Sequence, residues 1–342
     1  MTYEKAGVSI EANDRFVTMI KKLVEKTWPK SGKEIGGFGG GGTIPSRAKI
    51  ITASVDGVGT KTQIASLMGI WDTIGIDAVA MSSVDVYVSG GIPAFLYDYL
   101  TIKNLKPDLH IKIIEGLVKG CLLSDCRLVG GETAEHPFNW LPHDFFDIAT
   151  FCVGFQNPKL VPKINEIRPG MKIYGWLSYG LGSNGYSLVS KVLKLDGRSR
   201  ARLTEFYQAF GWTLGEELLR PTKIYIKDLE KIRGDKRYRP IIKAHSHITG
   251  GGLIGNIPRI LPQDCKVMLD RTKWQHPPVF KLIQEKGYIS DDEMDRTFNQ
   301  GLQLITIVSR GKIRHPDCRL VGIVEKRRRK DAQVEFIGEF RE

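Results

Sequence analysis

Long apolar runs are missing from this sequence, and no stretch approaches the roughly 20 residues that a membrane-spanning helix needs. The first residues, MTYEKAGVSIEANDRF, are polar and mixed in charge, which is not the pattern of a signal peptide. Cysteines are few, odd in number at five and never arranged as CxxC, which argues against a zinc ribbon and against a disulfide framework. These absences favour a protein of the reducing cytoplasm with no membrane partner.

Familiar catalytic signatures are absent as well. The Walker A loop GxxxxGK[ST] occurs nowhere, and no order of serine, histidine and aspartate suggests an activated nucleophile. Basic residues give a net charge of +12, but they are dispersed and do not alternate with aromatic residues as in many nucleic-acid-binding proteins. The one dense run, Lys326–Lys330, is expected to be a solvated hairpin or turn between strands at 320–324 and 334–337. The charge therefore suits a phosphorylated small molecule better than a nucleic acid.

The chain is long enough for two domains. Its 342 residues are 42% hydrophobic and 26% charged, as is typical of a globular protein. Residues 13–26 place apolar side chains at helical spacing, and prolines between residues 157 and 172 predict a boundary between domains 1–165 and 166–342. The other predicted elements are strands at 50–55, 94–101, 126–129, 148–153 and 172–176, helices at 73–89 and 109–122 and from Tyr186, and an apolar segment at 253–260.

The segment Asp56–Lys61, DGVGTK, follows a predicted strand and combines several anion-binding features. Its glycines, Gly57 and Gly59, let backbone N–H groups approach an anion, Lys61 supplies a positive charge, and Asp56 can hold a metal ion. This combination is what a nucleoside triphosphate with Mg²⁺ requires. An ordinary glycine turn at the end of a strand explains the same residues equally well.

A second glycine-rich segment, Gly36–Gly42, contains six glycines in seven residues. Apart from Phe38 it has no side chains to pack, so it is either a flexible linker or a flap that closes over a ligand. Its aromatic residue and its position shortly before Asp56 favour the flap.

Carboxylates stand out at two further places. Asp85 lies among apolar residues of a predicted helix, where it is either a satisfied buried polar group or a metal ligand. Glu132 and Glu135 follow a predicted strand and a glycine pair. That arrangement suits divalent-metal binding or proton transfer, and it equally suits the capping pattern of a helix start.

His245 and His247 precede the glycine turn Thr249–Gly252. Their spacing suggests zinc only weakly because no third ligand is apparent, and a substrate-facing His247 is the better interpretation. Farther along, Arg296 and Asn299 are suited to a phosphate or an amide, although a surface turn explains them equally well. Glycine turns, carboxylates and dispersed lysines together favour phosphoryl chemistry.

In chain order, eleven segments resemble the phosphoribosylformylglycinamidine cyclo-ligases, also called aminoimidazole ribonucleotide synthetases. Each motif alone is weak, but together they extend over nearly the whole chain and are specific to this family within its superfamily. The segments are Tyr3–Val8, Gly36–Gly42, Asp56–Lys61, Asp72–Asp77, Gly130–Glu135, Phe151–Gly154, Ser183–Val189, Pro221–Lys227, His247–Gly252, Asn256–Pro262 and Arg296–Gly301.

The resemblance implies an α+β protein of two α/β domains, whose N-terminal strands form a barrel across a homodimer. It also implies a ligase of purine biosynthesis that uses ATP and Mg²⁺. ATP phosphorylates the amide oxygen of formylglycinamidine ribonucleotide to an iminophosphate, and an amidine nitrogen of the same molecule then displaces phosphate as the imidazole ring closes. The products are aminoimidazole ribonucleotide, ADP and phosphate.

The family's roles fall on matching positions of this chain. Asp56 and Asp85 would be Mg²⁺ ligands, and Lys61, Asp56 and His247 would form the catalytic set. The nucleotide-binding residues implied are Gly37, Phe38, Gly39, Gly57, Gly59, Thr60, Lys61 and, less directly, Glu132. The substrate-binding residues implied are Ser183, Asn184, Thr249, Gly250, Gly251, Arg296 and Asn299.

Three positions depart from the family's pattern: Val84 replaces an asparagine, Gly182 a histidine and His136 a methionine. The first two motivate an alternative, a weakened or differently specific ATP-binding member of the same superfamily. Thiamine monophosphate kinase and selenophosphate synthetase are examples. Against these, no reactive cysteine lies in a glycine-rich N-terminal loop, and the segments RTFNQG and NIPRILP are those of the cyclo-ligase.

Overall fold

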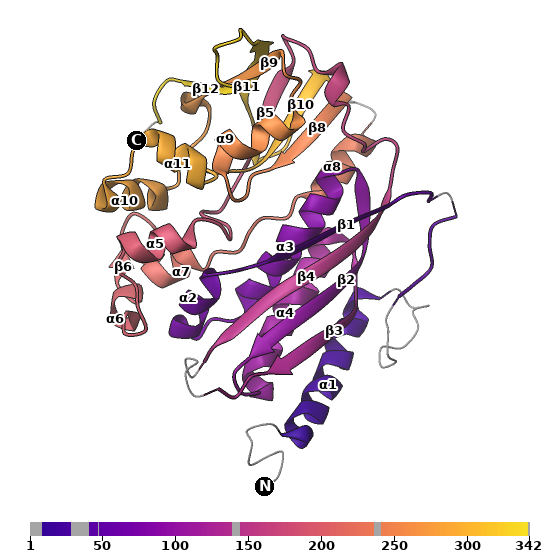
Figure 1. The fold of residues 1–342 in the computed structure, drawn as a ribbon, viewed down its shortest axis with the longest axis vertical. Helices are drawn as coiled ribbons and strands as arrows, with labels where there is room; N and C mark the ends of the chain where they lie inside the picture. The colour runs from indigo at the N-terminus through magenta and orange to yellow at the C-terminus, as the bar shows by residue number, and fades with distance from the viewer. Residues whose placement is uncertain (1–8, 29–40, 47, 139–143, 236–240, 341–342) are drawn as a thin grey trace.

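The computed structural model describes residues 9–28, 41–46, 48–138, 144–235 and 241–340, which form two α/β units (Figure 1). The expected α+β class and its two units are confirmed. The N-terminal unit contains a sheet of order β1-β4-β2-β3, in which only β2 and β3 are parallel. Its elements are α1 (Ile10–Val24), η2 (Glu25–Thr27), β1 (Ile51–Gly57), α2 (Lys61–Met68), α3 (Asp72–Val88), β2 (Gly91–Ile102), α4 (Pro107–Ser124), β3 (Arg127–Glu135) and β4 (Phe146–Gln156).

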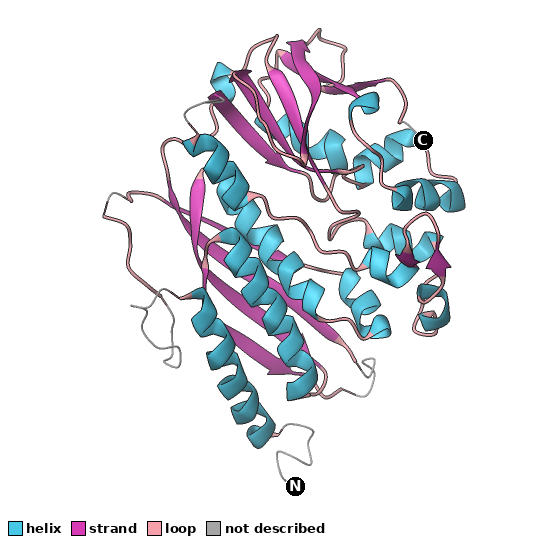
Figure 2. Ribbon diagram, turned by 180° about the vertical axis from the view of Figure 1, so that it is seen from behind, coloured by secondary structure: helices cyan, strands magenta, loops and turns pink. Residues whose placement is uncertain are grey.

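Helices cover one face of this sheet, as Figure 2 shows from behind. Helix α3 is central, because it packs between the strands and α4 and is apolar on nearly all sides. It begins at Asp72, whose carboxylate suits the positive end of a helix, and it is followed by Gly90 with a φ of 96°. This helix therefore holds its few polar residues, Asp77 and Asp85 among them, at fixed places in a packed layer.

The C-terminal unit is built on a sheet of order β12-β9-β11-β5-β10-β8 and carries the short hairpin β6–β7. Its first half comprises η3 (Ile164–Glu166), β5 (Lys172–Leu177), α5 (Tyr186–Val192), α6 (Arg200–Leu203), β6 (Phe206–Tyr207), β7 (Trp212–Thr213), α7 (Leu214–Leu218) and α8 (Ile226–Gly234). Its second half comprises β8 (Ile241–His247), α9 (Gly252–Asn256), η4 (Ile257–Ile260), β9 (Cys265–Asp270), η5 (Arg271–Lys273), α10 (Pro278–Gly287), α11 (Asp291–Thr297), β10 (Leu302–Arg310), β11 (Cys318–Lys326) and β12 (Val334–Ile337).

The run Lys326–Lys330 is a solvated turn, one of the two forms expected. The other form, a hairpin of the flanking strands, is wrong, because β9 lies between β11 and β12 and pairs with both. A second local prediction is wrong as well. The segment Gly130–Glu135 is not a turn after a strand but the second half of β3 itself. The helix at 13–26, in contrast, is confirmed as α1 with η2.

The two units share a core. The largest cluster of buried apolar side chains runs from α3 and α4 into the C-terminal sheet, and a second cluster lies wholly within the C-terminal unit. All five cysteines are buried free thiols, which agrees with the absence of a disulfide framework expected from the sequence. Within the described ranges, no helix is long and apolar enough to cross a membrane. The junction between the units is therefore a packed interface to which both halves contribute buried apolar side chains.

Candidate active site

Asp56 lies near the end of β1, where the strand gives way to the glycine turn. Its carboxylate accepts a hydrogen bond from the N–H of Gly57 at 2.7 Å. Gly59 has a φ of 68°, a conformation that favours glycine, and it directs the chain into α2 after Thr60. The Thr60 hydroxyl lies 3.0 Å from that of Ser187 on α5, so the turn faces the C-terminal unit.

Asp85 and His247 meet across the junction. The Asp85 carboxylate, on α3, lies 2.9 Å from Nδ1 of His247, on β8. Partial burial raises the pKa of the Asp56 carboxyl, and the nearby Asp85 carboxylate raises it further while His247 opposes the shift. Three residues that the sequence placed in the catalytic and metal sets therefore lie close together, although they come from β1, α3 and β8.

The two carboxylates fit a divalent cation. Burial is the main cause of the raised pKa of Asp56 and repulsion by Asp85 adds to it, and a cation between the two carboxylates would relieve that repulsion. Among the described residues, no group of three or more histidine, cysteine, aspartate or glutamate side chains can hold a metal. A cation here would therefore need oxygen ligands from phosphate or water, as Mg²⁺ bound to a nucleotide has.

The histidines do not form a zinc site in the part of the chain that is described. His245 lies 2.8 Å from the Thr306 hydroxyl, and burial lowers the pKa of His245 to about 3, so its ring is neutral. His247 is 4% exposed and bonds Asp85, so it supports a carboxylate where we expected it to face the substrate.

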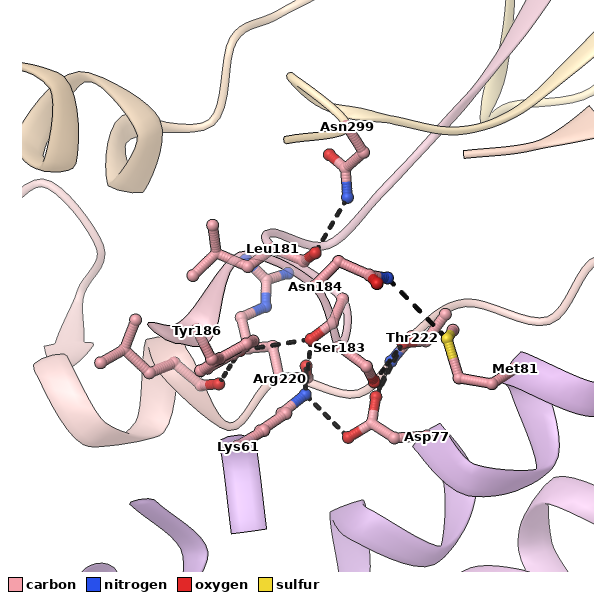
Figure 3. A network of polar contacts seen from close by, with 12 residues as sticks. Lys61, Asp77, Met81, Leu181, Ser183, Asn184, Tyr186, Arg220, Thr222 and Asn299 are labelled. Carbon is pink, nitrogen blue, oxygen red and sulfur yellow. Dashed lines mark hydrogen bonds and ion pairs between the residues drawn. The ribbon is translucent and has the colours of Figure 1, made fainter. Parts of the chain in front are cut away.

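Lys61 contradicts the expected phosphate contact. Its side chain is 0% exposed, and its ammonium group forms an ion pair with Asp77 at 2.7 Å. It also donates to the carbonyl oxygens of Gly182 at 2.9 Å and Arg220 at 2.8 Å, so all three of its protons are used (Figure 3). Burial lowers the pKa of Lys61, and the Asp77 carboxylate opposes that shift. Lys61 therefore holds the two units together and does not point at a nucleotide.

Asp77 completes this buried network. One of its oxygens accepts hydrogen bonds from the backbone N–H of Thr222 at 2.8 Å and from its hydroxyl at 2.7 Å. The Ser183 hydroxyl lies 3.2 Å from the same threonine hydroxyl, which places the loop after β5 beside α3 (Figure 3). Sequence reasoning did not assign roles to Asp77 and Thr222, although both lie in segments that carried the resemblance.

Two loops expected to bind substrate do come together. A Cβ on Gly250 would lie 3.6 Å from Oδ1 of Asn184, so the loop after β8 faces the loop after β5. The Asn256 amide donates to the carbonyl oxygens of Thr249, Gly250 and Gly252, at 3.3, 3.1 and 2.8 Å. Gly251, with a φ of 95°, permits the tight turn between these bonds. The structure therefore gathers Ser183, Asn184 and the Thr249–Gly251 turn at one end of the junction.

Asn299 and Arg296 were also expected to bind substrate, but neither belongs to these two loops. The Asn299 amide donates to the carbonyls of Gly180 and Leu181 and accepts from Ser178 and Gly301, so its polar atoms are already committed to the loop after β5. This contradicts the expectation that Asn299 contacts the substrate directly, because nothing on its amide is left to offer. Arg296 lies exposed near the end of α11.

Glu132 also lies apart from Asp56. It is exposed on β3, on the same side of the sheet as its partner Tyr99, whereas Asp56 pairs with buried Thr150 and shares the helix-covered side. Residues three apart in a strand point to opposite faces, so Glu132 and Glu135 do not converge. The structure thus contradicts a shared site for Glu132 and Asp56 within one chain. Gly37, Phe38 and Gly39 lie outside the described residues.

Comparisons with known proteins identify the family of the two units. Residues 43–156 match the family described as "AIR synthase related protein, N-terminal domain", and residues 168–334 match its C-terminal domain. The fold and the junction thus define a two-domain protein of the AIR synthase related class. A solved structure, the thiamine-monophosphate kinase of Stenotrophomonas maltophilia, shares the fold with a TM-score of 0.63 at 14% identity, covering 94% of this chain and 96% of the kinase.

Sequence relatives narrow the class. The phosphoribosylformylglycinamidine cyclo-ligase of Syntrophus aciditrophicus is 40% identical over 90% of this chain and 88% of its own length. That of Geotalea daltonii is 42% identical over 95% and 92%. The chain belongs to the phosphoribosylformylglycinamidine cyclo-ligase family. The alternative superfamily members weighed from the sequence are not favoured, because these relatives of about 40% identity are cyclo-ligases, whereas the thiamine-monophosphate kinase is similar only in fold.

Proposed function

We propose that this protein catalyses the ATP-dependent ring closure of formylglycinamidine ribonucleotide to aminoimidazole ribonucleotide, a step of purine biosynthesis. The observation that carries the proposal is the cluster of Asp56, Asp85 and His247 at the junction of the two units. We infer the reaction from the family to which the chain belongs, and we infer its location from the cluster. Two carboxylates from the N-terminal unit face the loops of the C-terminal unit, so a nucleotide and a second substrate can meet there.

The chemistry needs two things from the protein. An amide oxygen is a poor leaving group, so ATP first converts it into a phosphate ester of the iminol, and an amidine nitrogen of the same molecule then attacks that carbon. Because the attack is intramolecular, it depends on positioning more than on a strong base. The chain must therefore hold the phosphates and keep the two ends of the substrate close together.

We assign the phosphate end to the β1–α2 turn and to α3. Asp56 and Asp85 would hold Mg²⁺, which neutralises phosphate charge when it is bound. His247 keeps Asp85 in place through its hydrogen bond, and the backbone at Gly57, Gly59 and Thr60 supports the phosphates. Gly37, Phe38 and Gly39 remain predicted nucleotide contacts.

We assign the substrate end to the facing loops, which carry Ser183, Asn184, Thr249, Gly250 and Gly251. Arg296 remains a predicted phosphate contact from the adjoining helix. The net charge of +12 favours both phosphorylated ligands over neutral ones. These are small-molecule partners, and no nucleic acid is required.

The test is ADP release from ATP with and without formylglycinamidine ribonucleotide, with aminoimidazole formation followed in parallel. Substrate-stimulated turnover is expected, and its absence would contradict the proposal. Asp56→Asn should abolish turnover and Mg²⁺ binding while the circular dichroism spectrum is unchanged, because a neutral amide does not replace a carboxylate as a ligand. The matched control is Asp108→Asn, since this exposed carboxylate pairs with Arg15 on the surface.

A further inference from the structure

Gln303 is a buried amide beside the candidate active site to which no role has been assigned. It lies on β10 next to Leu304, whose register partner on β8 is His247, and it is 2% exposed. Its amide nitrogen lies 3.4 Å from the carbonyl oxygen of Ile248 and 3.4 Å from Nε2 of His247. One end of this side chain therefore reaches the histidine that supports Asp85.

The direction of the amide is fixed by these contacts. A carbonyl oxygen can only accept, so the NH₂ end of Gln303 must face Ile248, because a flipped amide would bring two oxygens together. Toward His247 the same NH₂ acts as donor, which makes Nε2 the acceptor and leaves the ring proton on Nδ1, facing Asp85. The amide oxygen Oε1 consequently points the other way.

That oxygen has no partner. Oε1 of Gln303 is buried and makes no hydrogen bond to any described residue. It faces Gly182, where an added Cβ would lie 3.2 Å from Oε1 and 3.3 Å from the Thr222 hydroxyl. The donors nearby are already committed, since Thr222 bonds Asp77 and the Asn299 amide bonds Gly180 and Leu181.

A buried acceptor without a donor is costly, because it has given up hydration and received nothing in return. The missing donor must therefore come from outside the fold. The neighbouring loop, Gly182–Asn184, is one that we assign to the substrate, and Gly182 has no side chain to stand between that loop and the oxygen. The geometry favours a small N–H donor that enters beside Gly182.

We propose that Gln303 Oε1 accepts a hydrogen bond from the amidine of the ribonucleotide substrate. This inference rests on the proposed function, which supplies an amidine, a group whose nitrogens carry several N–H donors. If Gln303 Oε1 holds one nitrogen of the amidine in place, the orientation of the other amidine nitrogen is fixed as well. That second nitrogen is the nucleophile, and its orientation decides whether it faces the activated carbon. Because the opposite end of the amide touches His247, one side chain links the substrate to the histidine that holds Asp85.

The experiment compares two buried glutamines on opposite sides of Gly301. Gln303→Met keeps the length of the side chain and removes both the acceptor Oε1 and the NH₂ group that contacts Ile248 and His247. Gln300→Met is the matched control, because both ends of its amide are paired, with His276 and Asp295. For each variant the melting temperature of the ligand-free protein, the Kd for formylglycinamidine ribonucleotide by calorimetry and the KM for each substrate are measured.

Gln303→Met should lower the melting temperature less than Gln300→Met does, weaken the binding of the ribonucleotide about tenfold and change the KM for ATP much less than that. Gln300→Met should lower the melting temperature and leave ribonucleotide binding unchanged.

The inference is overturned if Gln303→Met lowers the melting temperature as Gln300→Met does and binds the ribonucleotide normally. A single water in the cavity of about 10 Å³ beside Gln303 and His247 would then be the hydrogen-bond donor to Oε1. If the unmodified protein neither binds nor converts the ribonucleotide, the proposed function fails together with the inference. The two failures are distinguishable because the second is seen before any substitution is made.

Discussion

At the scale of single residues, Lys61 shows what a sequence motif cannot reveal. A lysine after two glycines at the end of a strand has the composition of a phosphate site, and the motif alone left that interpretation open. The partners that decide the matter are distant in sequence: Asp77 on α3 and the carbonyls of Gly182 and Arg220 in the other unit. No local pattern contains them. Asp56 and Asp85 stay predicted metal ligands, because the sequence explains Asp56 equally well as part of an ordinary glycine turn and Asp85 equally well as a satisfied buried polar group.

Lys61→Met should therefore destabilise the whole protein before it affects nucleotide binding. The substitution leaves the Asp77 carboxylate buried without its cation, which typically costs about 3–5 kcal/mol. The free energy of unfolding measured by chemical denaturation should fall by that order, and Asp77→Leu in the same chain should recover part of the loss. Lys119→Met is the control, since the pair of Lys119 with Asp72 is exposed and should contribute less than about 1 kcal/mol. If Lys61→Met has normal stability and binds ATP more weakly, Lys61 contacts the phosphates after all.

At the scale of elements, the spacing of apolar residues and the positions of turn residues predicted most helices and strands of the N-terminal unit within a few positions. The failures have physical causes. Gly130 and Gly131 suggested a turn, but β3 continues through both. Glycine is required at position 131 because a Cβ there would overlap the side chain of Asp98 on the neighbouring strand. The strand β12 pairs with β9, about 70 residues earlier, and local sequence does not encode such a pairing. Long-range register is thus the part of the fold that the pattern leaves open.

Helix α3 depends on one close crossing with α4. A Cβ on Gly75 would overlap the backbone of Ile113 and Leu117, and one on Gly116 would overlap the carbonyl of Asp72. Gly75→Ala should therefore force the helices apart, cost at least about 1–3 kcal/mol and reduce activity, because α3 carries Asp77 and Asp85.

The control for this crossing is Gly255→Ala in α9, where an added Cβ meets nothing within 4 Å. Because alanine is the better helix former, this variant should be as stable as the original protein or more stable by up to about 1 kcal/mol. Thermal unfolding and turnover are measured for both variants. If Gly75→Ala is as stable as Gly255→Ala, the α3–α4 contact is looser than described.

At the scale of the whole molecule, the N-terminal sheet has one face that no helix of the described residues covers. Figure 1 looks onto this side of the strands, and Figure 2 shows the helices behind them. Ile51, Val55, Tyr99 and Phe151 expose large apolar side chains, at 63%, 68%, 50% and 42%. A patch of this kind on strands favours an interface. We therefore retain the homodimer that the resemblance implies, with the two sheets facing each other as a barrel, as a prediction.

Val55→Asp tests this interface without disturbing the core. The side chain is already exposed in the single chain, so a carboxylate there should leave the fold intact, whereas two like charges at a symmetric apolar interface should separate the subunits. Light scattering after gel filtration should find two chains per particle for the original protein and one for the variant, with the same circular dichroism spectrum. Leu122→Asp is the control, because this leucine is 44% exposed on α4, in the helix layer behind the sheet, and should leave the dimer intact. A monomeric original protein, or a variant that remains dimeric, would exclude this face as the interface, and the exposed strands would then need another explanation.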